Sequence, residues 1–361
     1  MSKQVISLPH IAEMTIKSKG MKKVRWGILG VANIAVKKVI PAMQRGAHCE
    51  VTGIASRDGA RAEKAAREAG IPKAYGSYED LLADPEIEAI YNPLPNHLHV
   101  PWSIRAAEAG KHVLCEKPLS MNAPEALELI AARDRAGVVI GEAFMVQTHP
   151  QWVRLVELVR GGRIGELRAG MSSFGYFNRN RDNIRNVGAY GGGALMDIGC
   201  YPIKVSRMVF GAEPKRVAAT MVRDAELDGI DWLTSAVLEF PSGQMVFTCA
   251  TQAAANQSAV FFGTGGRVWL DIPFNALPGQ VSRLRLDDGR DLTGGGAAVE
   301  EIAACDQYTI QGDLFSRAVR EGGPPPVPLE DSLRNMAVID AVFRAAASGK
   351  WEEPQVPVAA R

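Results

Sequence analysis

A lysine that ends a strand and precedes a proline is the residue whose placement most strongly suggests chemistry. The stretch "HVLCEKPLSMN", His112 to Asn122, runs from a strand-like segment into Glu116, Lys117 and Pro118. Charged residues and a proline at a strand end are typical of a solvated turn. A lysine fixed there would instead offer a positive charge and a hydrogen-bond donor to a reacting oxygen atom. This stretch alone leaves both interpretations open.

A second pair of polar residues lies in the glycine-led segment "GGGALMDIGCY". Asp197 and Tyr201 are four residues apart, so they share one face if the segment is a helix. Pro202 cannot donate to the carbonyl of Ile198, which predicts an irregular helix at that point. Asp197 is either a functional acid or a carboxylate that stabilises a helix N-terminus. Tyr201 is either a reactive phenol or a half-buried core residue.

The elements around these residues fall into two groups. From Val24 to about Ala143, short apolar strands alternate with helices, which predicts a doubly wound parallel sheet. Beyond about Gln151, strand-like runs follow one another without intervening helices, which predicts a large open sheet that is mostly antiparallel. The expected fold class is therefore α/β, with two domains.

Composition excludes several classes of protein. The 361 residues suit two domains, and the net charge of +1 gives no reason to expect a nucleic acid or an anionic membrane as partner. No apolar run approaches the length of a membrane span. The first 22 residues lack the apolar core of a signal peptide, and the five scattered cysteines suggest reduced thiols, so we expect a cytoplasmic protein.

The segment "GILGVANIA" joins the first strand to the first helix and predicts a dinucleotide site. Gly30 opens the turn, and Ala32 stands where the common pattern has its second glycine. Asn33 and Ile34 begin the helix, whose free N–H groups can face a pyrophosphate.

The end of the second predicted strand distinguishes between the two nicotinamide cofactors. Ser56 and Arg57 stand there, with Arg61 downstream, in place of the acid that usually binds the ribose of NAD. A hydroxyl and guanidinium groups suit a 2′-phosphate, which predicts NADP rather than NAD. We assign Asp58 to capping the next helix.

Polar residues also follow the fourth predicted strand, at the edge where sheets of this kind bind ligands. Cofactor contacts are predicted for Asn92, Pro93, Leu94, Asn96 and His97. The histidines of this segment, His97 and His99, are either ligand contacts or the start of a helix. No third residue has the spacing of a metal site, so no metal is expected.

The order of these motifs resembles that of the Gfo/Idh/MocA oxidoreductase family. The resemblance extends from Val24 to about Pro354 through "RWGILG", "NPLPNHLH", "AGKHVLCEKPLSMN", "EAFMVQTHPQ", "GGGALMDIGCYPI" and "DQYTIQGDLFSRAV". The chain looks most similar to the branch of glucose–fructose oxidoreductases, aldose–aldose oxidoreductases, aldose 1-dehydrogenases and dimeric dihydrodiol dehydrogenases. Gln147 departs from the pattern, because the family commonly has an arginine there.

The sequence pattern and the resemblance together suggest a division of the chain, and the resemblance implies a mode of assembly. An N-terminal arm at 1–22 would precede a dinucleotide-binding Rossmann domain at 23–146. A substrate-binding and oligomerisation domain at 147–361 would follow. Its open sheet would face the active site or a partner subunit, in a homodimer or homotetramer.

The resemblance also implies roles for the polar residues noted first. Lys117 would lie at the nicotinamide, with a cis bond before Pro118, and Asp197 and Tyr201 would complete the catalytic group. Tyrosine is a poor base at its ordinary pKa, but a nearby lysine ammonium favours the phenolate. We therefore interpret Tyr201 as the proton acceptor, Lys117 as its electrostatic partner and a donor to the alcohol oxygen, and Glu116 as an anchor of the turn at the cofactor.

Other residues are expected to contact a carbohydrate substrate, together with Lys117 and the Asp197–Tyr201 pair. His149 and Arg185 would contact sugar hydroxyls, and Tyr308 would close the pocket from the second domain. The loop "RNRDNIRN", residues 179–186, is either a carbohydrate-binding loop or a solvated charged loop.

We predict an NADP-dependent oxidoreductase that transfers a hydride between C1 of a cyclic aldose, giving a lactone, and nicotinamide. In one variant NADP stays tightly bound under the N-terminal arm and a second sugar recycles it. The alternatives are a dihydrodiol dehydrogenase, a keto- or anhydro-sugar reductase, and a non-catalytic NADP-binding sensor. A sensor has no chemical need for both Lys117 and Tyr201.

Overall fold

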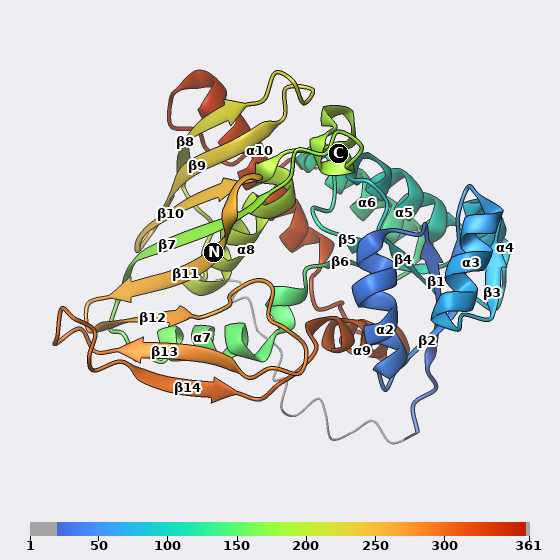
Figure 1. Cartoon of the computed structure of the whole chain (residues 1–361), viewed down its shortest axis with the longest axis horizontal. Coiled ribbons are helices and arrows are strands. Elements are labelled where there is room, and N and C mark those ends of the chain that lie inside the picture. The colour runs from blue at the N-terminus through green and yellow to red at the C-terminus, as the bar shows by residue number, and fades with distance from the viewer. Residues whose placement is uncertain (1–19, 359–361) are drawn as a thin grey trace. The chain divides into compact units, whose positions relative to one another are not determined.

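The computed structural model describes residues 20–358 and shows two compact units (Figure 1). The N-terminal unit contains residues 20–145 and Asp306–Leu333, and the C-terminal unit contains Val146–Cys305 and Arg334–Pro357. Of the arm expected at 1–22, only residues 20–22 lie in the described part. Residues 306–333, expected in the second domain, pack within the N-terminal unit instead.

The N-terminal unit is built on six parallel strands in the order β3-β2-β1-β4-β5-β6, which confirms the doubly wound sheet. The strands are β1 (Val24–Leu29), β2 (Cys49–Ala55), β3 (Lys73–Tyr75), β4 (Ala89–Asn92), β5 (His112–Glu116) and β6 (Ile140–Ala143). The helices are η1 (Ala35–Val39), α2 (Ile40–Arg45), α3 (Gly59–Ala69), α4 (Tyr78–Ala83), η2 (Asn96–Leu98), α5 (His99–Glu108), α6 (Ala123–Ala136) and α9 (Gln307–Glu321). The strand order reverses between β1 and β4, where such sheets bind ligands at their carboxyl ends.

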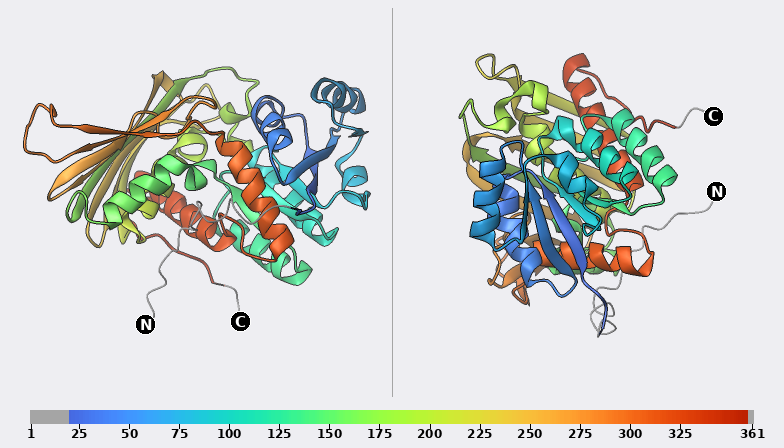
Figure 2. Two further views of the ribbon diagram at one scale, coloured as in Figure 1. Left: turned by 90° about the horizontal axis from the view of Figure 1, so that it is seen from below. Right: turned by 90° about the vertical axis from the view of Figure 1, so that its right-hand side faces the viewer.

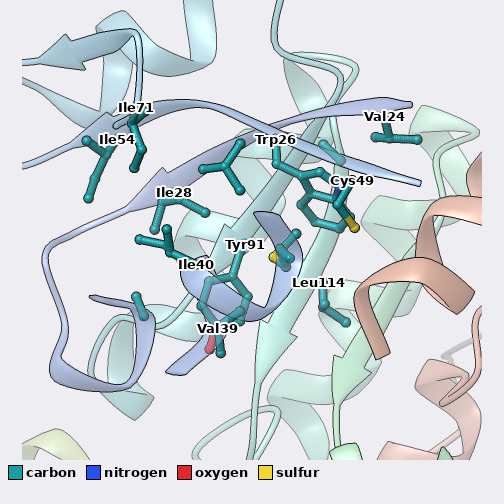
Figure 3. Close-up of a cluster of buried hydrophobic side chains, with 14 of the residues drawn as sticks. Val24, Trp26, Ile28, Val39, Ile40, Cys49, Ile54, Ile71, Tyr91 and Leu114 are labelled. Carbon is teal, nitrogen blue, oxygen red and sulfur yellow. The ribbon is translucent and has the colours of Figure 1, made fainter. Parts of the chain in front are cut away.

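The core of this unit explains why α9 belongs to it. Trp26 of β1 is completely buried in a cluster of apolar side chains from β1, β2, β4 and η1 (Figure 3). Its ring lies 5.4 Å from that of Phe315, and its indole N–H donates to the Ser316 hydroxyl at 3.1 Å. Phe315 is also fully buried, so α9 supplies part of the core although it comes late in the chain.

Local signals fix the helices on either side of the predicted site. Asp58 accepts from the Arg61 N–H at 3.2 Å, and Gly70 ends α3 in the left-handed conformation, which confirms the assignment of Asp58 as a cap. Asn122 accepts from the Glu125 N–H at 3.0 Å at the start of α6. This cap determines where the chain becomes helical after the turn that contains Lys117.

The C-terminal unit contains an eight-stranded sheet in the order β14-β13-β12-β11-β7-β10-β9-β8. Its neighbouring strands are antiparallel except β7 and β10, which confirms a mostly antiparallel sheet within the described chain. The strands are β7 (Leu167–Phe177), β8 (Arg216–Arg223), β9 (Asp231–Phe240), β10 (Gly243–Ala250), β11 (Gln252–Gly263), β12 (Gly266–Leu270), β13 (Ser282–Asp287) and β14 (Ala298–Ile302).

Within this unit, helices pack on one face of the sheet and leave the other face of the sheet uncovered (Figure 2). They include α7 (Pro150–Arg160) and α8 (Cys200–Phe210). The remaining helical segments are η3 (Met145–Thr148), η4 (Ile184–Asn186), η5 (Gly188–Tyr190), η6 (Leu195–Gly199) and α10 (Leu329–Ser348). The segment η6 is a π-helical turn that leads directly into α8 and contains Ile198, which confirms the predicted irregularity before Pro202.

Candidate active site

The turn after β1 is shaped for the close approach of a ligand. Gly30 has φ +80°, and its N–H donates to the Ala55 carbonyl at 2.9 Å. A Cβ at this position would lie 3.0 Å from Leu94 Cδ2 and 3.5 Å from the Tyr78 hydroxyl. Only glycine combines this backbone conformation with so little space. The first helical residues, Asn33 and Ile34, follow at once, with Asn33 exposed.

Positive charge and hydroxyl groups gather at the end of β2, beside this turn. Ser56 is buried and accepts from the Asp58 N–H at 3.2 Å. Arg61 is exposed and donates to the Val31 carbonyl at 2.9 Å, which holds its guanidinium near the glycine turn.

Tyr78 also belongs to this group, and sequence reasoning missed it. Burial raises the pKa of Tyr78, and the Arg57 guanidinium, which hydrogen-bonds the phenol, acts against that rise. The Tyr78 ring packs edge-on against Trp102, with ring centroids 4.8 Å apart. The only signal in the sequence was an aromatic residue directly after the helix cap Ser77. A glycine turn with no room for a Cβ, next to exposed guanidinium groups, fits a dinucleotide that carries an additional phosphate.

The segment after β4 is held by its own side chains. Asn92 is completely buried, and its amide donates to the His99 carbonyl at 3.0 Å and to the Ser103 hydroxyl at 3.1 Å. Its side-chain oxygen accepts from the Leu94 N–H at 3.3 Å. Asn92 therefore positions the loop that continues through Pro93 to Asn96 and His97, where η2 begins.

His99 joins this loop to the turn that contains Lys117. It begins α5, and its ring is buried. The ring nitrogens lie 2.8 Å from the Pro118 carbonyl oxygen and 2.7 Å from the Leu94 carbonyl oxygen. Burial lowers the pKa of His99 to about 4, and the neutral ring has one N–H, so it donates to one of these two carbonyls at a time while packing between both segments. Of the two interpretations, His99 is a helix-start residue.

Lys117 stands at the end of β5 among acidic and phenolic groups. Tyr91 donates to Glu116 Oε1 at 2.5 Å, and the Lys117 N–H donates to Glu116 Oε2 at 3.2 Å. The Lys117–Pro118 peptide is cis, as the family resemblance implies. Burial and the charge of Glu116 raise the pKa of Tyr308, while the Lys117 ammonium opposes this rise. Glu116 therefore anchors the turn, and Tyr308 is a neighbour within the N-terminal unit, not a residue of the C-terminal one.

In the C-terminal unit, Asp197 is the centre of a polar cluster. The Tyr176 hydroxyl donates to Asp197 Oδ2 at 2.5 Å, and Arg185 Nε pairs with the same oxygen at 2.9 Å. The charge of Asp197 is the main reason that the pKa of Arg185 is raised, and Tyr176 and Tyr201 contribute in the same direction. Tyr176 was not predicted, because its position in an alternating strand gives no functional signal.

Tyr201 and His149 lie deeper in the unit than expected. Tyr201 is 5% exposed, and its ring packs against Phe174 and Phe274 with centroids 5.5 Å and 5.4 Å away. These rings restrict the phenol to one orientation. His149 is 1% exposed and caps α7 by accepting from the Gln151 N–H at 3.2 Å. Burial lowers the pKa of His149 to about 4, which favours a structural role.

The two ends of the loop at 179–186 fit different predictions: one end resembles a solvated charged loop, and the other faces the polar cluster. Arg179 pairs with Asp224 and Glu226, both at 3.0 Å, at a partly solvated surface. Arg185 instead points to Asp197. Across residues 20–358, no cluster of histidine, cysteine or acidic side chains suits a metal ion, and no described helix has the length and apolarity to cross a membrane.

The parallel sheet with its glycine turn, and the lysine at a strand end on the same edge, define a dinucleotide-dependent oxidoreductase with a separate sheet-bearing unit. Residues 24–144 match the oxidoreductase family with an NAD-binding Rossmann fold, and residues 152–269 match the GFO/IDH/MocA C-terminal domain. The chain belongs to the Gfo/Idh/MocA oxidoreductase family.

Curated relatives span almost the whole chain. An uncharacterized oxidoreductase of Rhizobium meliloti is 50% identical, covering 92% of this chain and 99% of the relative. A D-xylose 1-dehydrogenase (NADP(+)) of Haloferax volcanii is 40% identical, covering 90% and 98%. A trans-1,2-dihydrobenzene-1,2-diol dehydrogenase of Mus musculus is 35% identical, covering 67% and 73%.

Solved structures agree with this assignment. The 3-ketoreductase KijD10 of Actinomadura kijaniata, in complex with NADP and TDP-benzene, has a TM-score of 0.84 and 32% identity over 90% of this chain and 98% of its own. The aldose-aldose oxidoreductase of Caulobacter crescentus, complexed with glycerol, has a TM-score of 0.84 and 27% identity over 92% and 100%.

Proposed function

We propose that the protein is an NADP-dependent sugar oxidoreductase that moves a hydride between C1 of a cyclic aldose and nicotinamide, giving a lactone in the oxidative direction. The Tyr176–Asp197–Arg185 cluster beside Tyr201 carries this proposal. It presents fixed hydrogen-bond donors and an acceptor, which a substrate with several hydroxyl groups requires. The likeness to an NADP-dependent xylose dehydrogenase supports it.

The N-terminal unit would bind the cofactor, with residues 23–146 as its main segment. The pyrophosphate would lie at the Gly30 turn and the start of the first helix, and Ser56, Arg57 and Arg61 would hold the 2′-phosphate. When bound, NADP supplies the acceptor for the hydride. Glu116 and the loop from Asn92 to His97 would border the nicotinamide side.

The proton of the sugar hydroxyl needs a separate acceptor. Tyr201 takes this role in the proposal, and Lys117 donates a hydrogen bond to the same oxygen and favours the phenolate. Asp197 keeps Arg185 in place, and both contact substrate hydroxyls. Tyr308, beside Lys117 and Glu116, is a further candidate for substrate contact.

A dihydrodiol dehydrogenase and a keto-sugar reductase use the same hydride and proton transfers, and relatives with these activities support keeping both as alternatives. The decisive experiment assays the pure protein with aldoses, polyols, dihydrodiols and keto sugars, each with NADP and with NAD. The proposal predicts the highest kcat/KM for an aldose with NADP. A preference for a dihydrodiol or for NAD would contradict it.

The tight-binding variant has its own test. Protein denatured after purification should release about one nicotinamide per chain if a second sugar recycles a resident cofactor. If no nicotinamide is released, the tight-binding variant is contradicted, and NADP exchanges with the solution in each turnover. The five free thiols support the cytoplasm, a reducing compartment, as the proposed location.

The open face of the C-terminal sheet supports self-association as a dimer or tetramer. Strand pairing places five apolar residues in one row across β11, β7, β10, β9 and β8: Val260, Met171, Val246, Val237 and Ala218. The next row along the strands consists of Ser258, Ser173, Thr248, Ser235 and Thr220. Met171 is 54% and Val246 is 41% exposed, which is unusual for apolar side chains on a sheet.

Met171→Glu tests this assembly, because a charge in the apolar row would be buried without a partner. Light scattering should show smaller particles for this variant than for the wild type. The matched control, Lys350→Glu in the exposed bend that follows α10, should leave the mass unchanged. A monomeric wild type would contradict the proposed assembly.

A further inference from the structure

A buried carboxylate outside the polar cluster holds the start of the helix that contains Asp197 and Tyr201. Asp231 is the first residue of β9 and is 1% exposed. Its Oδ2 accepts from the Leu195 N–H at 2.8 Å and from the Thr234 hydroxyl at 2.8 Å. Leu195 is the first residue of η6, the π turn that contains Asp197.

This contact replaces the usual helix cap. The first N–H groups of a helix have no partner within the helix and normally use a side chain just before it. Ala194 precedes η6 and has no side-chain acceptor. A carboxylate from a neighbouring strand takes that place, and its negative charge suits the positive end of the helix dipole. The bond therefore ties the helix to the sheet.

Gly193 connects Asp231 to both members of the Arg185–Asp197 ion pair. It has φ +114°, and a Cβ there would lie 2.1 Å from Asp231 Oδ1, so the carboxylate sits directly against its backbone. The Gly193 N–H donates to the Arg185 carbonyl at 2.9 Å, and the Asp197 N–H donates to the Gly193 carbonyl at 3.1 Å. A shift of Asp231 would therefore move the backbone at Arg185 and at Asp197.

We propose that Asp231 is a positioning residue for catalysis, because its ionised carboxylate fixes the backbone at the start of η6 and so places Asp197 and Tyr201. Asp231 does not contact the substrate in this account. The inference rests on the proposed function only where it gives Asp197 and Tyr201 their roles.

The surroundings of Asp231 make this role depend on pH. Burial raises the pKa of Asp231 to about 6, against the opposing effects of its hydrogen bonds and of the Arg223 charge. Cys249 faces Asp231 from β10. Burial is the main cause that raises the pKa of the Cys249 thiol, and the charge of Asp231 and the neighbouring Cys200 raise it further. The carboxylate is therefore ionised above about pH 6 and gains a proton below it.

The test is the pH profile of kcat for the wild type and two variants. Wild-type kcat should fall as the pH drops through about 6. Asp231→Asn should lower kcat at least about tenfold at neutral pH and remove this acid limb, with KM for NADP unchanged. Thr234→Val removes a hydrogen bond that lowers the pKa of Asp231, so its acid limb should move to higher pH. Glu239→Gln, near the other end of the same strand and paired with the exposed Arg216, is the matched acid-to-amide control and should keep the wild-type profile.

A spectroscopic measurement separates this proposal from the proposed function. In protein with isotope-labelled tyrosine and no substrate, the Tyr201 ring signal should shift as Asp231 titrates and should not shift in Asp231→Asn. This result would support the positioning role even if Tyr201→Phe kept full turnover and the proposed function failed. The proposal would be overturned if the acid limb of kcat stayed at the wild-type pH in both Asp231→Asn and Thr234→Val. It would also be overturned if the Tyr201 ring signal did not depend on the titration of Asp231.

Discussion

Replacing Asp231 with asparagine should change how the stability of the protein depends on pH. The ordinary pKa of an aspartate in the unfolded chain is 3.8, and that of folded Asp231 is about 6. This difference of about two units corresponds to about 3 kcal/mol, at roughly 1.4 kcal/mol per unit.

The sign follows from the direction of the shift. A raised pKa means that the folded state binds the proton more tightly, so the stabilising contribution is complete below about pH 4. It is lost as the pH rises through about 6. Asparagine has no such proton and makes no such contribution at any pH.

Urea unfolding of both proteins from pH 4 to pH 7 provides the assay. Other acids also titrate in this range, so the quantity to compare is the difference in unfolding free energy between wild type and Asp231→Asn. That difference should change by about 2.4 kcal/mol in favour of the variant as the pH rises from 4 to 7, most of the full effect of about 3 kcal/mol. A difference that stays constant across this range would refute the account of Asp231 as a buried carboxyl with a raised pKa.

Two further predictions concern the N-terminal unit. Arg57→Ala should weaken NADPH binding about 10- to 100-fold in fluorescence titrations and leave NADH binding nearly unchanged, because a charge-assisted bond to the 2′-phosphate is lost. Arg67→Ala, on an exposed part of α3, is the control, and an equal loss for NADH would count against the assignment. His99→Ala should lower the urea unfolding free energy by about 1–3 kcal/mol and raise KM for NADP, because the buried imidazole that packs between the Leu94 and Pro118 carbonyls and donates to one of them is lost. If neither the unfolding free energy nor KM for NADP changed, the His99 ring would not hold the segments of Leu94 and Pro118 together.

The sequence predicted the N-terminal sheet well because its physical signals are local. Parallel strands buried on both faces appear as short apolar runs, and the Asp58 cap and the Gly70 stop mark the helix between them. The position of α9 could not be predicted in this way. Its packing depends on Phe315 and Ser316 meeting Trp26, nearly the whole chain away.

In the C-terminal unit, β13 and β14 are short strands with several charged residues, so their own sequences give only a weak signal. In β13, "SRLRLD", arginines alternate with leucines as in a half-exposed strand, whereas in β14, "AVEEI", two adjacent acidic residues interrupt such alternation. Their stability comes from pairing and from cross-strand ion pairs such as Arg283 with Glu301.

Candidate site residues could be named from the sequence where a motif marks them, as at Gly30, Lys117 and Tyr201. Tyr78, Tyr176 and Asp231 have no such mark. Each sits in an ordinary helix or strand pattern, and only the folded chain brings it to Arg57, Asp197 or Leu195. The supporting contacts of a site are therefore less visible in a sequence than its reactive groups.

The most direct test of the central claim compares wild type with Tyr201→Phe, using NADP and the aldose that the substrate panel ranks first. The account predicts NADP binding within about twofold of wild type and a kcat lower by about 10²- to 10⁴-fold, because the proton acceptor is lost while the cofactor unit is untouched. Formation of reduced NADP by Tyr201→Phe at the wild-type rate would contradict it.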